Sequence, residues 1–248
     1  MSMPRKIRCV VESVVHHGGR VYTVDLEPAS PVPVFHPGQF LHLTVDDFDP
    51  ASFWPESRVF SMASSPRDRS RIRICYSVKG RYTTRMEQAL QAGREVWVKL
   101  PYGDFVIGEA DEAVLLAGGT GISAFTAFLE GLNPESRQQV TLVYGARTPG
   151  LLLFREMILA RLASVPNLSV IFFTEETDPG FDRQMAALAK APACFTGRIS
   201  LDLLWPRLAG AASQVYYLSG PPPMLQTLAV ELKTRGVPPA QIRTDAWE

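Results

Sequence analysis

The sequence predicts a two-domain protein in which an antiparallel six-stranded β-barrel precedes a parallel α/β domain. Its 248 residues exceed the ~100–150 residues that are usual for one domain. Short segments of alternating apolar and polar residues fill the first part of the chain. After PYGDF at 101–105, short continuous apolar runs alternate with segments of helical length instead. We therefore expect a barrel domain at residues 1–103 and an α/β domain at 104–248.

The strands of the barrel are predicted from the turn-forming residues that separate them. Such residues cluster at 16–19, at the proline-rich 28–38 and at 64–70. A single helix is expected to interrupt the strands, with Thr83 as its N-cap and Met86, Ala89 and Leu90 at helical spacing. The expected strands are 7–15, 20–26, 39–45, 58–62, 71–78 and 95–100.

The α/β domain is predicted from apolar runs that lack alternation. A strand buried on both faces has this pattern, and helices between such strands favour a parallel sheet covered on both sides. The runs are 113–117, 140–144, 168–173 and 215–218, and the helices begin near residues 121, 151, 200 and 222.

Composition excludes several function classes. The 25 basic and 25 acidic residues cancel without a basic block, which argues against a nucleic-acid or anionic membrane partner. No apolar stretch is long enough to span a membrane and no leader-like segment opens the chain, so we expect a cytoplasmic protein. The three cysteines are widely separated and the four histidines form no ligand pattern, so we expect neither an iron-sulfur cluster nor another metal.

Two clusters in the barrel could bind a nucleotide cofactor. Arg58 supplies a bidentate cation for a pyrophosphate, Phe60 a flat face for an aromatic ring, and Ser61 a hydroxyl for a ring nitrogen. The turn at Gly80 and Thr83 opens a helix whose backbone N–H groups attract phosphate. The alternatives are a strand-end arginine beside a core phenylalanine, and an ordinary capped helix.

Two further clusters follow buried strands of the α/β domain. Residues 118–121, GGTG, let a backbone approach a dinucleotide, although the strand ending at Tyr144 lacks the acid of a standard Rossmann dehydrogenase. The segment from Ser219 to Met224 opens the next helix, and it could alternatively be a rigid proline junction. The chain ends in Asp245-Ala-Trp247-Glu248, either a frayed tail or an aromatic lid beside a carboxylate.

Together and in this order, the five clusters resemble the ferredoxin–NADP reductase family. That family pairs an FAD-binding barrel with a nicotinamide-binding α/β domain. The resemblance implies FAD contacts at Arg58, Val59, Phe60, Ser61, Tyr76, Val78, Gly80, Tyr82 and Thr83. It implies nicotinamide dinucleotide contacts at Gly119, Thr120, Gly121, Gly145, Arg147, Ser219, Gly220, Pro222 and Met224. It also implies a catalytic set of Ser61, Ser219, Asp245 and Trp247, with Trp247 covering the flavin ring. The chain departs from the family in having Phe60 where tyrosine is commoner and Ser219 where cysteine is frequent.

The activity implied by this resemblance is hydride transfer from NADH or NADPH to N5 of FAD, followed by electron transfer to a separate acceptor. The acceptor would be a ferredoxin, a flavodoxin or an oxygenase component, and the chain is expected to be a monomer. An NAD(P)H:flavin reductase that releases reduced flavin is the alternative, favoured by the RVFSMAS run and the terminal DAW. A non-enzymatic nucleotide-binding module is the third.

The choice of nicotinamide depends on the residues after the strand at 168–173. Glu175 and Glu176 would repel a 2′-phosphate and could accept hydrogen bonds from a ribose diol, which favours NADH. The alternative is a solvated acidic turn. An arginine elsewhere in the domain could still reach a phosphate, and the candidates are Arg147, Arg183 and Arg198.

Overall fold

The structure, a computed structural model, describes residues 3–108, 112–208 and 210–245. It divides into two compact units, of which the first takes in Met1–Val106 with Ser123–Phe128 and the second Ile107–Ile122 with Leu129–Glu248. Each unit contains its own apolar core. The boundary expected between residues 103 and 104 stays a prediction.

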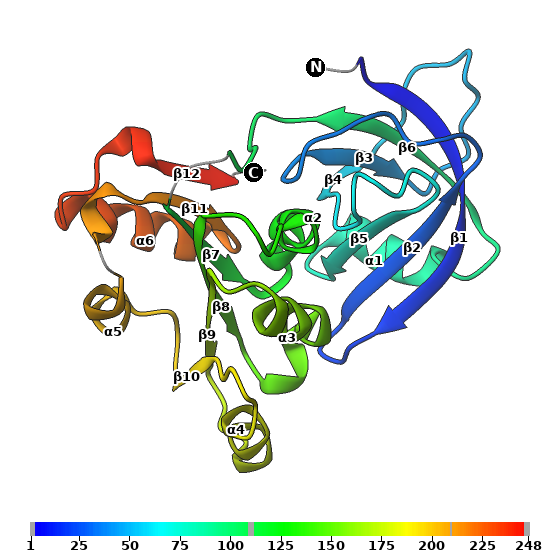
Figure 1. The fold of residues 1–248 in the computed structure, drawn as a ribbon. Helices are drawn as coiled ribbons and strands as arrows, with labels where there is room; N and C mark the ends of the chain where they lie inside the picture. Colours follow the sequence, from blue (N-terminus) through cyan, green and yellow to red (C-terminus); the bar gives the residue numbers. More distant parts are fainter. Residues whose placement is uncertain (1–2, 109–111, 209, 246–248) are drawn as a thin grey trace. The chain divides into compact units, whose positions relative to one another are not determined.

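The first unit is built on a six-stranded antiparallel sheet that curls into a nearly closed barrel (Figure 1). The strands are β1 (Arg5–His16), β2 (Val21–Pro28), β3 (Phe40–Thr44), β4 (Arg58–Ser61), β5 (Ile72–Ser77) and β6 (Glu95–Tyr102). Their order is β4-β3-β6-β1-β2-β5. Residues at alternate positions, such as Val24, Leu41, Ile74 and Val98, are fully buried. The predicted barrel is confirmed, and β4 and β5 are its two edge strands.

Helix α1 (Arg81–Ala89) begins three residues earlier than an N-cap at Thr83 predicts. Gly80 is the N-cap, and Thr83 is the third helical residue, whose hydroxyl accepts hydrogen bonds from the backbone N–H groups of Lys79 at 2.9 Å and Gly80 at 3.2 Å. The prediction of Thr83 as N-cap was therefore wrong. Glycine has no side-chain oxygen to cap with, so the hydroxyl three residues later reaches back instead.

The second unit is a six-stranded parallel sheet with the order β10-β9-β8-β7-β11-β12. Its strands are β7 (Glu112–Gly118), β8 (Gln139–Ala146), β9 (Leu168–Thr174), β10 (Ala193–Thr196), β11 (Val215–Ser219) and β12 (Ile242–Asp245). The helices between these strands are α2 (Ser123–Gly131), whose first six residues are counted with the first unit, and α3 (Arg155–Ser164), α4 (Pro179–Ala186), α5 (Leu201–Leu204) and α6 (Pro222–Thr234). Short 3-10 turns are η1 (Gly119–Ile122), η2 (Pro149–Leu151), η3 (Trp205–Arg207), η4 (Ala211–Ser213) and η5 (Pro239–Gln241).

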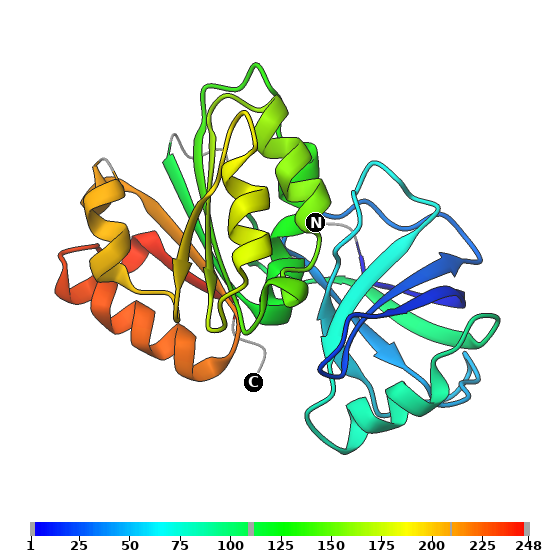
Figure 2. The same ribbon diagram turned by 90° about the horizontal axis from the view of Figure 1, so that it is seen from below.

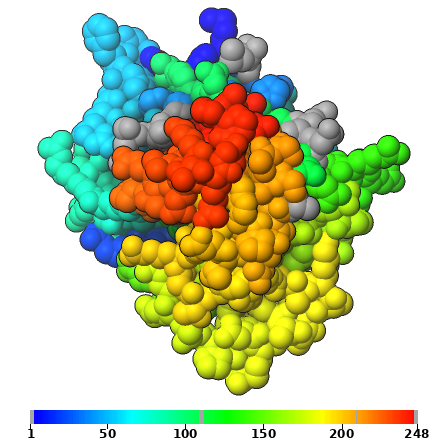
Figure 3. Space-filling model, turned by 90° about the vertical axis from the view of Figure 1, so that its left-hand side faces the viewer, coloured from blue at the N-terminus to red at the C-terminus, as the bar shows by residue number. Residues whose placement is uncertain are grey.

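Helices cover both faces of this sheet, which confirms the predicted α/β architecture. Helices α5 and α6 lie on one face, and α3 and α4 lie on the other (Figure 2). Figure 3 looks onto the side of the unit formed by α6 and the edge strand β12, coloured orange to red. Within the described ranges, no helix is both long and apolar enough to cross a membrane.

The strand order of the second unit reverses next to β7. The chain adds β8, β9 and β10 on one side of β7, and then returns to add β11 and β12 on the other. In open parallel sheets, ligands bind beyond the carboxyl ends of the strands at such a reversal, because the connections on either side leave in opposite directions. The carboxyl ends of β7 and β11 are therefore where a ligand is expected.

Candidate functional site

The barrel unit gathers its predicted FAD residues along its two edge strands. Phe60 lies on β4 and Tyr76 on β5, and their ring centroids are 6.2 Å apart at an angle of 60°. Arg58 begins β4, and Ser61 ends it with its side chain buried. The half-buried Val59 and Val78 lie on β4 and directly after β5. These two strands follow each other in the sequence and stand at opposite ends of the sheet order, so the curling of the sheet brings their residues together along one seam of the barrel.

The hydroxyl of Tyr76 is the most informative atom at this seam. The side chain is buried, and among the described residues the hydroxyl has no hydrogen-bond partner. Burial raises the pKa of Tyr76 above its ordinary value, so the phenol stays protonated. A buried donor without an acceptor costs free energy that a ligand carbonyl or ring nitrogen would recover. An isoalloxazine ring carries both kinds of acceptor, so this feature fits a flavin.

Arg58 is held against the face of a buried tyrosine. Its guanidinium lies 4.6 Å from the ring centroid of Tyr82, and its Nη1 donates to the backbone oxygen of Ser57 at 2.8 Å. Tyr82 is itself fixed, because its hydroxyl donates to the backbone oxygen of Leu43 at 3.1 Å and accepts from the N–H of Val45 at 3.3 Å. Tyr82 therefore acts as the platform on which Arg58 is positioned.

Two further arginines join Arg58 around one carboxylate. Oε1 of Glu56 lies 3.1 Å from Nη2 of Arg58 and 3.6 Å from Nη2 of Arg81, and Oε2 lies 3.4 Å from Nη1 of Arg85. Arg85 also pairs with Asp46. We call Arg58, Arg81 and Arg85 the arginine cluster. Planar guanidinium groups bind phosphate oxygens in a bidentate manner, so this donor set fits a pyrophosphate.

Sequence reasoning found Arg58 but missed Arg81 and Arg85. The available signal was their spacing of four on α1, which places two cations on one helix face at its first turns. The FAD contact predicted for Thr83 stays a prediction; its hydroxyl is engaged with the backbone at the start of α1, so the group left for a phosphate is the backbone N–H. The arginine cluster and Tyr76 are therefore the features of this unit that best fit FAD.

In the second unit, glycines allow the junctions after β7 and β11 to pack against each other. A Cβ at Gly118 would lie 2.5 Å from Sδ of Met224, and one at Gly121 would lie 2.3 Å from the backbone oxygen of Ser219. Gly220 has a φ of +157°, and its Cβ would lie 2.8 Å from Cε of Met224. These three glycines are explained by packing within the unit, and their predicted dinucleotide contacts stay predictions.

Gly119 differs from its neighbours. It has a φ of +54°, a left-handed conformation that glycine adopts without strain, and an added Cβ would meet no atom within 4 Å. It opens η1 at the carboxyl end of β7, with the half-buried Thr120 beside it. Of the glycines in this motif, Gly119 is therefore the one whose open side a phosphate could approach.

Ser219 and Asp245, which the sequence placed in separate clusters, form a buried pair. They are opposed in the parallel register of β11 and β12, and Oγ of Ser219 donates to Oδ2 of Asp245 at 2.9 Å. Their side chains are 3% and 5% exposed respectively. Asp245 is thus the end of a strand rather than part of a frayed tail. Trp247 lies outside the described residues.

The remaining predicted residues of this unit lie at the same edge of the sheet. Gly145 is near the end of β8, where a Cβ would lie 3.0 Å from Cγ1 of Ile199, and the exposed Arg147 directly follows that strand. Pro222 is the first residue of α6, and Met224 lies over Gly118. The structure therefore brings them to the carboxyl ends of adjacent strands.

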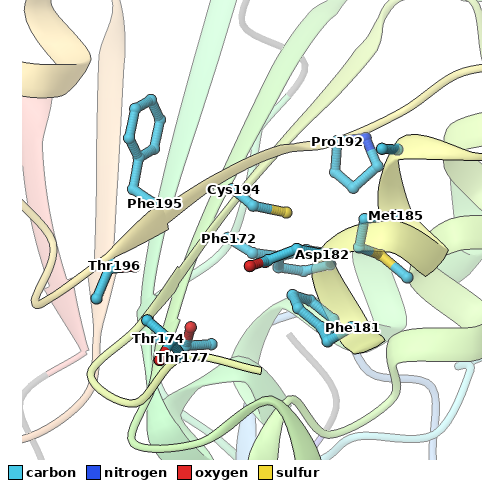
Figure 4. A pocket seen from close by; sticks show the side chains of 11 residues that line it. Phe172, Thr174, Thr177, Phe181, Asp182, Met185, Pro192, Cys194, Phe195 and Thr196 are labelled. Atoms are coloured by element: carbon cyan, nitrogen blue, oxygen red, sulfur yellow. The ribbon is translucent and has the colours of Figure 1, made fainter. Parts of the chain in front are cut away.

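A pocket of about 290 Å³ lies between α4 and the outer strands β9 and β10 (Figure 4). Phe181 and Met185 project from α4 toward Phe172, and Thr174 and Thr196 end the two strands. Cys194 faces Asp182, and burial together with this carboxylate raises the pKa of its thiol to about 11. Sequence reasoning missed this pocket because α4 and β10 were not predicted.

The acidic turn after β9 borders this pocket region. Glu175 and Glu176 are exposed, and Oε2 of Glu175 lies 3.4 Å from Nε of Arg198. One of the arginines that could have received a 2′-phosphate is therefore already paired with a carboxylate.

Known proteins match the chain in both sequence and fold. The model of the oxidoreductase NAD-binding domain family matches residues 115–229. The reductase component of propane 2-monooxygenase from Mycolicibacterium smegmatis is 26% identical over 97% of this chain and 67% of its own length. A flavohemoprotein from Deinococcus radiodurans is 28% identical over 86% of this chain and 51% of its own length. The ferredoxin reductase of carbazole 1,9a-dioxygenase superposes with a TM-score of 0.77 at 23% identity, covering 99% of this chain and 70% of that one.

These matches support the predicted two-domain fold. The chain spans between about half and about two thirds of the length of the curated relatives it matches.

Proposed function

Because this chain belongs to the ferredoxin–NADP reductase family, as its sequence predicted, we propose that it transfers a hydride from NADH to FAD and passes the electrons to a separate acceptor protein. The oxidoreductase class and the cofactors FAD and NAD(P)H are those of that family. The observation that carries the proposal is the sheet reversal of the second unit, where the open Gly119 turn and the Ser219–Asp245 pair lie at adjacent strand ends.

In the first unit, the residues of the barrel seam would hold FAD. The arginine cluster would bind the pyrophosphate, Phe60 would contact the isoalloxazine, and the Tyr76 hydroxyl would donate to it. FAD, when bound, supplies the conversion between two-electron and one-electron chemistry. The protein's own contribution is to bind and orient the ring.

In the second unit, the strand ends would hold the dinucleotide. Gly119 exposes backbone to a phosphate, and Asp245 fixes the orientation of the Ser219 hydroxyl by accepting its hydrogen bond. Because that proton is already directed at a carboxylate, the free lone pairs of Ser219 are the groups left to face a nicotinamide. Ser219 is therefore a positioning residue that needs no change in its protonation.

The adenosine end of the dinucleotide would occupy the pocket between α4 and strands β9 and β10. Neighbouring strands are about 4.8 Å apart, so β9 lies roughly 10 Å from β7, a distance that an extended dinucleotide can span. The phenylalanine and methionine side chains of the pocket suit a purine ring. Glu175, at its edge, favours NADH because it would repel a 2′-phosphate and already engages Arg198.

For the acceptor, we propose an oxygenase component. The support comes from relatives, since one is named as the reductase component of propane 2-monooxygenase and a structural neighbour as the ferredoxin reductase of carbazole 1,9a-dioxygenase. An NAD(P)H:flavin reductase is a second candidate. It is favoured by Glu56, a carboxylate in the middle of the arginine cluster that lowers its attraction for a pyrophosphate.

The test is anaerobic reduction of the purified, FAD-reconstituted chain. NADH should bleach the flavin absorbance in a single turnover, and Ser219→Ala should slow this step while leaving FAD binding intact. Flavin that stays oxidised in excess NADH and NADPH contradicts the proposal. Protein that is yellow after extensive dialysis supports the role with a separate acceptor protein, whereas colourless protein that turns over added flavin supports the flavin reductase.

The choice of nicotinamide is tested by exchanging a charge. We expect NADH to have at least about tenfold higher kcat/KM than NADPH, and Glu175→Arg to reduce that ratio. Glu135→Arg is the matched control, since Glu135 is an exposed glutamate in the turn before β8, at the amino ends of the strands. Equal kcat/KM for both nicotinamides in the unchanged chain contradicts the proposed preference.

A further inference from the structure

We propose that Glu56 is an internal competitor for the pyrophosphate of FAD, occupying the arginine cluster until the cofactor displaces it and thereby setting how tightly the flavin is retained. The inference rests on the proposed function, since it concerns the same cofactor. It assigns a role to a residue that neither the sequence motifs nor the predicted site contains.

The first step is the sharing of one carboxylate by three guanidinium groups. Both oxygens of Glu56 are in use, with Oε1 facing Arg58 and Arg81 at 3.1 and 3.6 Å, and Oε2 facing Arg85 at 3.4 Å. Asp46 pairs with Arg85 from the other side. Three cations are thus partly neutralised by two carboxylates before any ligand arrives. A pyrophosphate must compete with Glu56 for the same donors.

The second step is that these pairs are accessible and readily exchanged. The side chains of Arg58, Arg81 and Arg85 are 47%, 83% and 41% exposed, and that of Glu56 is 34% exposed. Ion pairs at such exposure contribute little to stability, because water screens them and long side chains lose entropy on pairing. A pyrophosphate offers more oxygens and more charge to the same guanidinium groups, so displacement of Glu56 is favourable.

The third step is that Arg58 keeps its position without the side chain of Glu56. Arg58 does not depend on Glu56 for its place, since it lies on the ring of Tyr82 and donates to the backbone oxygen of Ser57. The contact from Glu56 to Tyr82 involves its backbone oxygen, which lies 3.1 Å from the tyrosine Oη and shares the hydroxyl proton with the backbone oxygen of Leu43. A substitution that neutralises the Glu56 side chain therefore keeps both supports of Arg58 and removes only the competing charge.

The experiment is a titration of the flavin-free chain with FAD and with riboflavin, followed by flavin fluorescence. Riboflavin has the same ring but no phosphate, so only the binding of FAD depends on the arginine cluster. Glu56→Gln should lower the Kd for FAD about three- to tenfold and leave the Kd for riboflavin unchanged. The gain should shrink at high salt, because exposed charges are screened.

The matched control is Glu95→Gln. Glu95 lies on the same barrel and forms an exposed ion pair with Arg8 at 3.1 Å, so this variant loses one charge without touching the arginine cluster. It should leave both Kd values unchanged.

Three results overturn the proposal: a Kd for FAD that Glu56→Gln leaves unchanged, a Kd that it raises, or equal changes for FAD and riboflavin. A raised Kd would mean that Glu56 orients the arginines. The proposed function has a separate readout, because it fails only if NADH does not bleach the bound flavin, whatever Glu56→Gln does to binding.

Discussion

Adding one methyl group at each glycine of the motif after β7 separates a packing role from a ligand role. In Gly121→Ala, the new Cβ would lie 2.3 Å from the backbone oxygen of Ser219 and 2.6 Å from the nitrogen of Gly220. In Gly118→Ala, it would lie 2.5 Å from Sδ of Met224, the far part of a flexible side chain. In Gly119→Ala, it would meet nothing within 4 Å, although φ is +54°.

These distances rank the losses of stability. The clash at Gly121 is with backbone, so the end of β11 must move by about 1 Å, and we expect a cost of at least about 3 kcal/mol. Met224 can change rotamer, so Gly118→Ala should cost about 1–2 kcal/mol. Gly119→Ala should cost about 1 kcal/mol, because the alanine must adopt the left-handed conformation and meets no clash. The affinity for NADH should follow a different order. Relative to its small effect on the free energy of unfolding, Gly119→Ala should cause the largest loss of NADH affinity of the three variants.

Urea unfolding followed by circular dichroism measures the first ranking, and equilibrium titration with NADH measures the second. The double variant Gly118→Ala/Met224→Ala should lose less stability than the sum of its single variants, because the second change removes the clashing sulfur. A Gly121→Ala protein as stable as the unchanged chain would refute the packing argument. A Gly119→Ala protein with unaltered NADH affinity would refute the assignment of Gly119 to the phosphate.

One substitution tests the flavin site of the barrel unit, and one chemical label tests the pocket of the α/β unit. Tyr76→Phe should leave the flavin-free chain as stable as before or up to about 1 kcal/mol more stable, and should weaken FAD binding about three- to tenfold. The reason is that the hydroxyl has no partner among the described residues and would gain one in the ligand. A less stable chain with unchanged FAD affinity speaks against this prediction. Alkylation should select Cys194, since Cys9 and Cys75 are buried with pKa values of about 12. With a pKa of about 11, the Cys194 thiol is about 0.1% ionised at pH 8, so its labelling rate should rise about tenfold per pH unit up to pH 10; a rate that levels off near pH 8 excludes the raised pKa. Labelling should also slow when ADP-ribose fills the pocket. A labelling rate insensitive to ADP-ribose excludes the pocket as the adenosine site.

Elements with a strong local pattern were predictable. The alternating segments became β1 to β6, and the four apolar runs became β7, β8, β9 and β11 within a residue or two at their ends. Strand β10 has four half-buried or exposed residues, and β12 reads Ile-Arg-Thr-Asp, so neither carries the apolar signal of a buried strand. Both lie at sheet edges, where one neighbouring strand supplies the hydrogen bonds.

The sequence by itself determined the division into barrel and α/β architecture, the resemblance to the ferredoxin–NADP reductase family, and the positions of Arg58, Ser219 and the glycine turn. It could do so because periodicity, turn residues and contiguous motifs are local properties of the chain. Only the tertiary structure decided the partners: Asp245 for Ser219, and Glu56 for the arginine cluster. Strand register and the folding of α1 against the loop before β4 create these contacts, and a side chain's electrostatic environment is set by neighbours in space that sequence spacing does not specify.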